Sequence, residues 1–106
     1  MITYDDFKAV ELVIGKITSV ENHPDADKLY VLQVDLGTET RQMVAGLRPY
    51  YEPEQLAGKT VLVVANLQPA NLRGVESNGM LLAAQDGDKV VILTSDDTVS
   101  PGSKVL

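Results

Sequence analysis

Residues 73–80 combine a planar cation with small polar side chains and one adaptable apolar side chain. Arg73 supplies a guanidinium group, whose fork of donors suits a phosphate. Ser77 and Asn78 add small donors and acceptors, and Met80 adds a side chain that can contact the face of a base. Two glycines in the same stretch permit backbone angles and close approaches that other residues resist. The composition fits a ligand contact and an ordinary β-turn with Met80 in the core equally well.

A second candidate for chemistry is the segment His23-Pro24-Asp25-Ala26-Asp27. Its imidazole and two carboxylates could hold a divalent cation. Such a trio on a short loop is commonly a solvated turn, however, and no second ligand cluster accompanies it. Catalysis has even less support, because the chain has no cysteine, a single histidine, and no recognisable nucleophile–base pair or phosphate-binding loop. We expect no metal, no cofactor and no catalytic activity of the chain itself.

The chain is acidic, with nine basic and fifteen acidic residues among 106 and a formal net charge of −6. This charge opposes nonspecific binding to nucleic acid, which depends on neutralising phosphates. The excess of acidic residues lies in residues 1–27 and 86–106, whereas residues 28–85 hold five basic and five acidic residues. Binding follows the local field more than the total charge, so a basic face in the middle of the chain is compatible with the net charge.

Aromatic residues are scarce, with four Tyr, one Phe and no Trp. A barrel that binds extended single strands usually stacks bases on several exposed rings. Tyr50 and Tyr51 could form part of such a platform, but packing of this proline-flanked connection onto the rest of the domain explains them better. The scarcity of rings predicts that a nucleic-acid ligand would be recognised as a folded shape, through phosphates, 2′-hydroxyls and a few exposed bases.

Segments rich in apolar and β-branched residues predict six short strands, over residues 10–20, 28–37, 40–47, 59–67, 80–84 and 89–95. Gly15 interrupts the first strand, which indicates a bend or bulge in a strand long enough to serve both sheets of a small barrel. Residues 68–79 are predicted to form a turn-rich loop.

Two short helical segments are also predicted. Thr3 and Asp6 form a weak capping box for a helix over residues 3–10, and a single helical turn is expected over residues 53–56. The order of elements is typical of an all-β, five-stranded OB-fold barrel with one short helix between its third and fourth strands and extra terminal strands. The same order also fits another kind of small barrel. We expect a single domain over residues 1–106.

Four segments of the sequence resemble segments of a known protein family. These segments are "ITYDDFKAVELVIGKI", "HPDADKLYVLQVDLG", "RQMVAGLRPYYEPEQLAGKTVLVVANL" and "LRGVESNGMLLAA". The family is the tRNA-binding domain that is appended to many methionyl-tRNA synthetases and also occurs as free-standing dimeric tRNA-binding proteins and in cytokine-like synthetase cofactors. The resemblance implies an OB fold whose tail strands build a homodimer interface. It implies binding of tRNA by shape, and it assigns aminoacylation to an attached or partner catalytic chain of methionyl-tRNA synthetase.

The resemblance also implies a set of tRNA-facing positions. They are Lys28, Arg41, Asn66, Arg73, Gly74, Ser77, Asn78, Gly79 and Met80. The three basic residues would meet phosphates, Asn66 and Ser77 would hydrogen-bond, and Met80 would pack against a ribose or base. Asn78 and the two glycine backbones would shape the loop.

This sequence departs from the family at positions that often carry basic residues, where it has Gln68, Ala70 and Asn71. Each missing phosphate contact would reduce both the affinity for tRNA and the salt dependence of binding. We therefore expect one domain to bind tRNA more weakly than is typical of the family. A symmetric dimer would recover part of the affinity, because two linked sites raise the effective local concentration.

Two other functions are compatible with the same barrel. A related bacterial family uses it as an export-associated chaperone dimer that binds unfolded peptide, and a third reading is a module that only dimerises synthetase chains. The N-terminal residues lack the features of a signal peptide and no apolar run is long enough to span a membrane, so we expect a cytoplasmic protein without a membrane partner. The sequence fits both a free-standing protein and a part of a longer synthetase.

Overall fold

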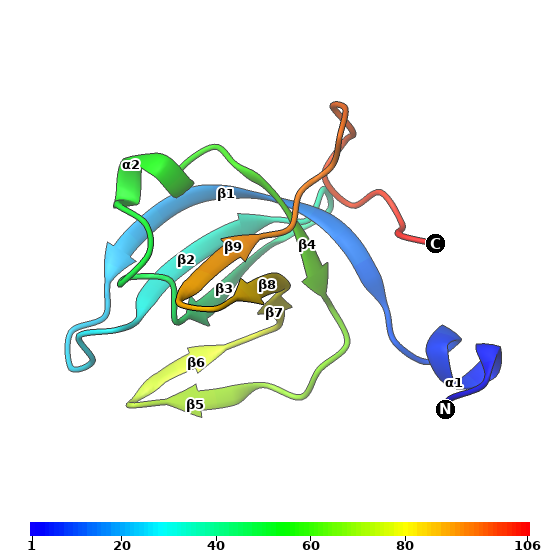
Figure 1. Cartoon of the computed structure of the whole chain (residues 1–106), viewed down its shortest axis with the longest axis horizontal. Coiled ribbons are helices and arrows are strands. Elements are labelled where there is room, and N and C mark those ends of the chain that lie inside the picture. The colour runs from blue at the N-terminus through cyan, green and yellow to red at the C-terminus, as the bar shows by residue number, and fades with distance from the viewer.

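Nine strands and two short helices make up the computed structural model, which describes all 106 residues (Figure 1). In chain order they are α1 (Tyr4–Lys8), β1 (Leu12–Asn22), β2 (Tyr30–Asp35), β3 (Thr40–Ala45), α2 (Pro53–Leu56), β4 (Thr60–Val64), β5 (Ala70–Leu72), β6 (Val75–Ser77), β7 (Met80–Leu81), β8 (Ala83–Asp86) and β9 (Lys89–Ile92). Both predicted helical segments are confirmed. The capping box of α1 forms as expected, with the Thr3 hydroxyl accepting from the Asp6 amide at 3.1 Å.

A five-stranded antiparallel sheet in the order β3-β2-β1-β4-β7 curls into a nearly closed barrel, which confirms the predicted fold class (Figure 1). The long strand β1 pairs with β4 along its first half and with β2 along its second half. Its register irregularity lies between Ile17 and Ser19, and not at the predicted Gly15. Gly15 is instead required by packing, because a Cβ atom there would lie 2.7 Å from Cγ1 of Val34.

The core follows from strict alternation along β2. Alternation along residues 28–37 places Tyr30, Leu32, Val34 and Leu36 on one apolar face, and all four are buried. They pack with residues of β1, β3 and β4, and α2 closes one end of the barrel with the fully buried Leu56. Burial of these apolar side chains is the main source of stability in a domain of this size.

The prediction of a loop over residues 68–79 is wrong in part, because this segment folds into the hairpin β5–β6. Its two turn residues, Arg73 and Gly74, have φ angles of 55° and 94°. Positive φ at both central residues gives a two-residue turn whose twist matches the right-handed twist of the flanking strands. Arginine is an uncommon residue in such a turn, so the residue types at positions 73 and 74 do not predict the hairpin.

The predicted strand over residues 80–84 is divided into β7 and β8, which belong to different sheets. Leu82 separates them, since its amide donates to the Leu62 carbonyl at 3.0 Å while its own carbonyl accepts from the Leu93 amide at 3.1 Å. The chain thereby passes from the barrel sheet to the second hairpin, β8–β9.

The C-terminal segment runs along the first half of β1. It makes one isolated bridge, between Val13 and Lys104, in place of the extra strand expected there. The Ile14 amide donates to the Ser103 carbonyl at 2.8 Å, and the Val105 amide donates to the Leu12 carbonyl at 2.9 Å. No helix of this structure has the length and apolar character needed to cross a membrane.

Candidate nucleic-acid interface

The hairpin β5–β6 is fastened to the loop of residues 23–28 through His23. The buried imidazole donates from Nε2 to the Leu72 carbonyl at 2.8 Å, and Nδ1 accepts from the Asp25 amide at 2.9 Å. These partners fix the neutral tautomer with its hydrogen on Nε2. Both ring nitrogens are therefore occupied by the backbone, and no cluster of three potential metal ligands is found in the structure.

Basic side chains from two other segments reach the same loop, which ends at the exposed Lys28. Arg73 donates from Nη2 to the Asp25 carbonyl at 3.0 Å, and Arg48 donates from Nη1 to the Ala26 carbonyl at 3.3 Å. Arg48 was not among the positions predicted from the sequence, and nothing local indicated that it meets this loop. We call Lys28, Arg48 and Arg73 the loop cluster. Asp25 and Asp27, which lie in the same loop, offset part of its charge.

Arg41 lies on β3 and is not part of the loop cluster. Its guanidinium has two partners. Nε pairs with the Glu39 carboxylate at 2.5 Å, and Nη1 donates to the Ala65 carbonyl. The side chain is 28% exposed. It is thus positioned by the barrel, with its charge paired to a neighbouring acid.

Asn66 serves as a link between the barrel and the N-terminal arm. Its Nδ2 donates to the Ala9 carbonyl at 2.7 Å, and its Oδ1 accepts from the Glu11 amide at 2.8 Å. These bonds hold the segment between α1 and β1. A contact between Asn66 and tRNA stays a prediction, and it would have to share the amide group with this link.

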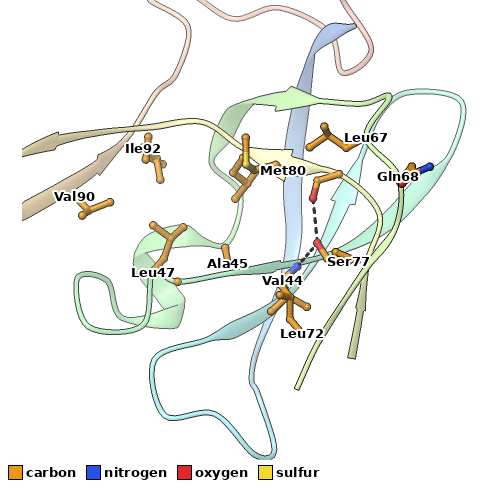
Figure 2. Close-up of a pocket in the computed structure, with 15 residues that line it drawn as sticks. Val44, Ala45, Leu47, Leu67, Gln68, Leu72, Ser77, Met80, Val90 and Ile92 are labelled. Carbon is orange, nitrogen blue, oxygen red and sulfur yellow. Dashed lines mark hydrogen bonds between the residues drawn. The ribbon is translucent and has the colours of Figure 1, made fainter. Parts of the chain in front are cut away.

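Ser77 is buried at the seam between β3 and the hairpin, with only 5% of its surface exposed. Its hydroxyl accepts from the Val44 amide at 2.9 Å and donates to the Gly79 carbonyl at 3.0 Å (Figure 2). Both bonds commit this hydroxyl to the protein itself, so a contact between Ser77 and tRNA stays a prediction.

The remaining predicted residues shape the surface next to this seam. The Asn78 amide donates to the Gln42 carbonyl at 2.8 Å, and its side chain stays half-buried. Gly79 has a φ of 129° and lies directly against Met43. Gly74 is exposed at the hairpin turn and has nothing near the position of a Cβ. Met80 is 48% exposed, so the expectation that it is available to a ligand is compatible with the structure.

An apolar cavity of about 400 Å³ lies beside Ser77, between β3, the hairpin β5–β6, β7 and β9. Figure 2 shows side chains from these elements around it, with Met80 and Leu67 near one side and Leu47, Val90 and Ile92 near the other. Eleven of its fifteen lining residues are hydrophobic, so it suits an apolar group better than a phosphate.

The two adjacent tyrosines have different environments. The Tyr51 hydroxyl accepts from the Ile92 amide at 3.1 Å, and its carbonyl accepts from the Tyr30 hydroxyl at 2.6 Å, which confirms the packing interpretation for Tyr51. Tyr50 is 43% exposed. Burial raises the pKa of Tyr30, and Glu52 adds to this effect while Arg48 opposes it. The neutral Tyr30 hydroxyl is therefore a stable donor within the core.

Residues 12–104 match a family described as "Putative tRNA binding domain". Over 104 residues the chain is 56% identical to the Methionine--tRNA ligase of Pyrococcus furiosus, a match that covers 98% of this chain but only 14% of that protein. This chain thus spans about one seventh of the length of that relative.

Two solved structures share the whole fold. The MetRS related protein of Pyrococcus horikoshii gives a TM-score of 0.94 at 34% identity and covers 100% of this chain and 98% of that chain. The CsaA chaperone protein of Picrophilus torridus gives a TM-score of 0.93 at 30% identity, with complete coverage of both chains.

Proposed function

The chain belongs to the tRNA-binding domain family, and we propose that it binds tRNA as a non-catalytic domain that accompanies a methionyl-tRNA synthetase. In this role the domain raises the affinity of the synthetase for tRNA, and aminoacylation takes place on an attached or partner catalytic chain. The proposed location is the cytoplasm. The proposal rests on family membership together with the placement of basic side chains from three segments around one loop.

The loop cluster is the observation that carries the proposal. Arg48 donates to the Ala26 carbonyl and Arg73 to the Asp25 carbonyl, so both guanidinium groups are positioned before any ligand binds. Each guanidinium has further donors that these single bonds leave available for phosphate oxygens. Phosphate contacts position a nucleic acid without reading its sequence. We therefore propose recognition of tRNA by its shape, with little dependence on sequence.

The affinity of a single domain is proposed to be modest. Gln68, Ala70 and Asn71 leave β5 and the residues before it without a positive charge. Asn71 has a structural function instead, because its Oδ1 accepts from the Gly74 amide at 2.9 Å across the hairpin turn. A basic residue at position 71 would add a phosphate contact but would remove this bond.

Arg73→Ala is expected to weaken tRNA binding by roughly three- to tenfold at low salt and to make the slope of log affinity against log salt shallower by about one. The reason is the loss of one phosphate contact. Filter binding over a series of salt concentrations measures both effects. Lys59→Ala, which removes a positive charge in front of β4, is the control and should have a smaller effect. Wild-type protein that retains tRNA no better than double-stranded DNA at low salt would refute the proposed function.

We also propose a homodimer that uses the second hairpin. Val91 and Leu93 on and after β9 are 43% and 38% exposed, and both strands of this hairpin lie outside the barrel sheet. Exposed aliphatic side chains on a two-stranded ribbon are typical of a surface that another chain covers. A dimer would carry two copies of the loop cluster. Binding of tRNA at one copy would raise the effective concentration of that tRNA at the other copy.

The double substitution Val91→Asp with Leu93→Asp is expected to convert the dimer into a monomer, because it places two charges in an apolar interface. Light scattering after gel filtration, at micromolar protein concentration, measures the mass. Gln85→Asp adds a charge to the exposed surface of β8 in the same hairpin and should leave the dimer intact. A wild-type protein that is monomeric at these concentrations would contradict the proposal.

A second candidate function is binding of unfolded peptide. It is supported by the similarity to the CsaA chaperone protein and by the apolar cavity, whose size and lining suit an aliphatic or aromatic side chain. Suppression of the aggregation of a model unfolded protein, without retention of tRNA, would favour this function over the first. Retention of tRNA without suppression would exclude it.

A further inference from the structure

The side chain of Arg41 is held by two partners that have different consequences for its charge. The Ala65 carbonyl accepts from Nη1 and fixes the position of the guanidinium without neutralising it. The Glu39 carboxylate accepts from Nε and does neutralise it. Both N–H groups of Nη2 and the second N–H group of Nη1 make no hydrogen bond within the protein, so three N–H groups remain available.

A polar hollow of about 450 Å³ lies next to this guanidinium, between β3 and the loop that follows β4. Arg41 is the only basic residue among its seven lining residues, and Glu39 is the only acidic one. Thr40 and Asn78 also line the hollow. The guanidinium and two small polar residues thus border a space that is large enough for a phosphate group.

We propose that this hollow receives a backbone phosphate of tRNA and that Glu39 competes with the phosphate for Arg41. The inference rests on the proposed function, and it adds an acidic residue that lowers affinity at the binding surface. The Glu39 side chain is 53% exposed, so the ion pair is screened by water and a phosphate can replace it. Ala65 continues to hold the guanidinium when the carboxylate leaves.

Glu39 could either compete with the phosphate for Arg41 or hold Arg41 in the orientation that binds the phosphate. A supporting acid would be needed to orient the guanidinium, and its loss would weaken binding. Here the Ala65 carbonyl already provides a fixed acceptor, and Arg41 lies on a strand that is paired along its length with β2. Removing the charge of the Glu39 carboxylate therefore leaves the Arg41 guanidinium in place and removes the anion that competes with a phosphate for it.

Glu39→Gln is the direct test, because glutamine keeps the shape and the acceptor oxygen while removing the charge. We expect the variant to bind tRNA about two- to fivefold more tightly at low salt, as the loss of a weak exposed ion pair allows. The slope of log affinity against log salt should also steepen, by up to about one. Glu54→Gln on α2 makes the same change in net charge outside the hollow and should have a smaller effect.

A double-mutant cycle tests whether the gain depends on Arg41. The tighter binding caused by Glu39→Gln should disappear in an Arg41→Ala background, because the competition needs both groups. Unchanged or weaker binding by Glu39→Gln would overturn the inference, and so would a gain equal to that of Glu54→Gln or one that persists without Arg41. Each of these results leaves the proposed function intact if the wild-type protein binds tRNA.

The hollow can also be tested without tRNA. Inorganic phosphate should shift the NMR signal of the Arg41 Nε–H group at lower concentration in Glu39→Gln than in the wild type. The absence of any shift in either protein, up to the highest phosphate concentration at which both stay folded, would overturn the phosphate site itself. Failure of the wild-type protein to retain tRNA would instead refute the proposed function, so the two failures are distinguishable.

Discussion

Gly79→Ala is expected to lower the free energy of unfolding by about 3 kcal/mol, because backbone strain and overpacking each cost about 1–3 kcal/mol. The φ angle of Gly79 is 129°, which L-residues with a side chain rarely adopt. A Cβ atom there would also lie 2.9 Å from Cε of Met43 and 3.1 Å from the Val64 carbonyl oxygen. Met43 is fully buried in the core and has little freedom to move away. Urea or thermal unfolding measures the change.

Two further glycines separate the contributions to this loss. Gly74 has a φ of 94° but nothing within 4 Å of the Cβ position, so Gly74→Ala should show the backbone strain alone. Gly46→Ala should cost least, because position 46 is exposed and a Cβ atom there would lie 3.9 Å from Cδ2 of Leu29. A Gly79→Ala variant no less stable than Gly74→Ala would show that the contact with Met43 is unimportant.

Ser77→Ala is expected to destabilise the protein by about 2–4 kcal/mol, since each buried polar group that loses its partner costs about 1–3 kcal/mol. The Val44 amide would lose its acceptor and the Gly79 carbonyl would lose its donor. These bonds join β3 to the segment that follows β6, where the barrel sheet has no continuous pairing. The total stability of a small domain is commonly about 5–15 kcal/mol, so the loss would be large.

The same variant separates a structural role for Ser77 from contact with tRNA. Ser100→Ala, at an exposed position near the C-terminus, is the matched control and should change stability little. At a temperature where both variants are folded, we expect Ser77→Ala to retain wild-type affinity for tRNA, because the hydroxyl is buried and both its bonds are internal. A loss of affinity without a loss of stability would instead support the prediction that Ser77 contacts the ligand.

Much of the fold was predictable from local patterns. Alternation along residues 28–37 identified the buried face of β2, and the proline at position 53 with the glycine at 58 located α2. The hairpin β5–β6 was missed because Arg73 and Gly74 do not form a typical two-residue turn sequence. The glycine of β1 was recognised as special, but the reason for it lies in Val34 on a neighbouring strand.

The candidate site was predictable only as a set of residue types. The sequence indicated that Arg41, Arg73 and Met80 could serve a ligand, and all three are at least partly exposed. Nothing in it indicated that Arg48 and Arg73 meet over the loop of residues 23–28. Arg48 and Ala26 are 22 residues apart, and Arg73 and Asp25 are 48 apart, so no local spacing could report these contacts.

By itself, the sequence determined the strands β1 to β4, the apolar face of β2 and the family, because these depend on the order of residues along short segments. Only the tertiary structure decided which polar groups are free to meet a ligand. It buried Ser77 at a seam, used Asn66 to anchor the N-terminal arm, and paired Arg41 with Glu39. The physical reason is that a hydrogen-bonding group is committed or available according to its neighbours in space, and those neighbours are set by strand pairing between distant parts of the chain.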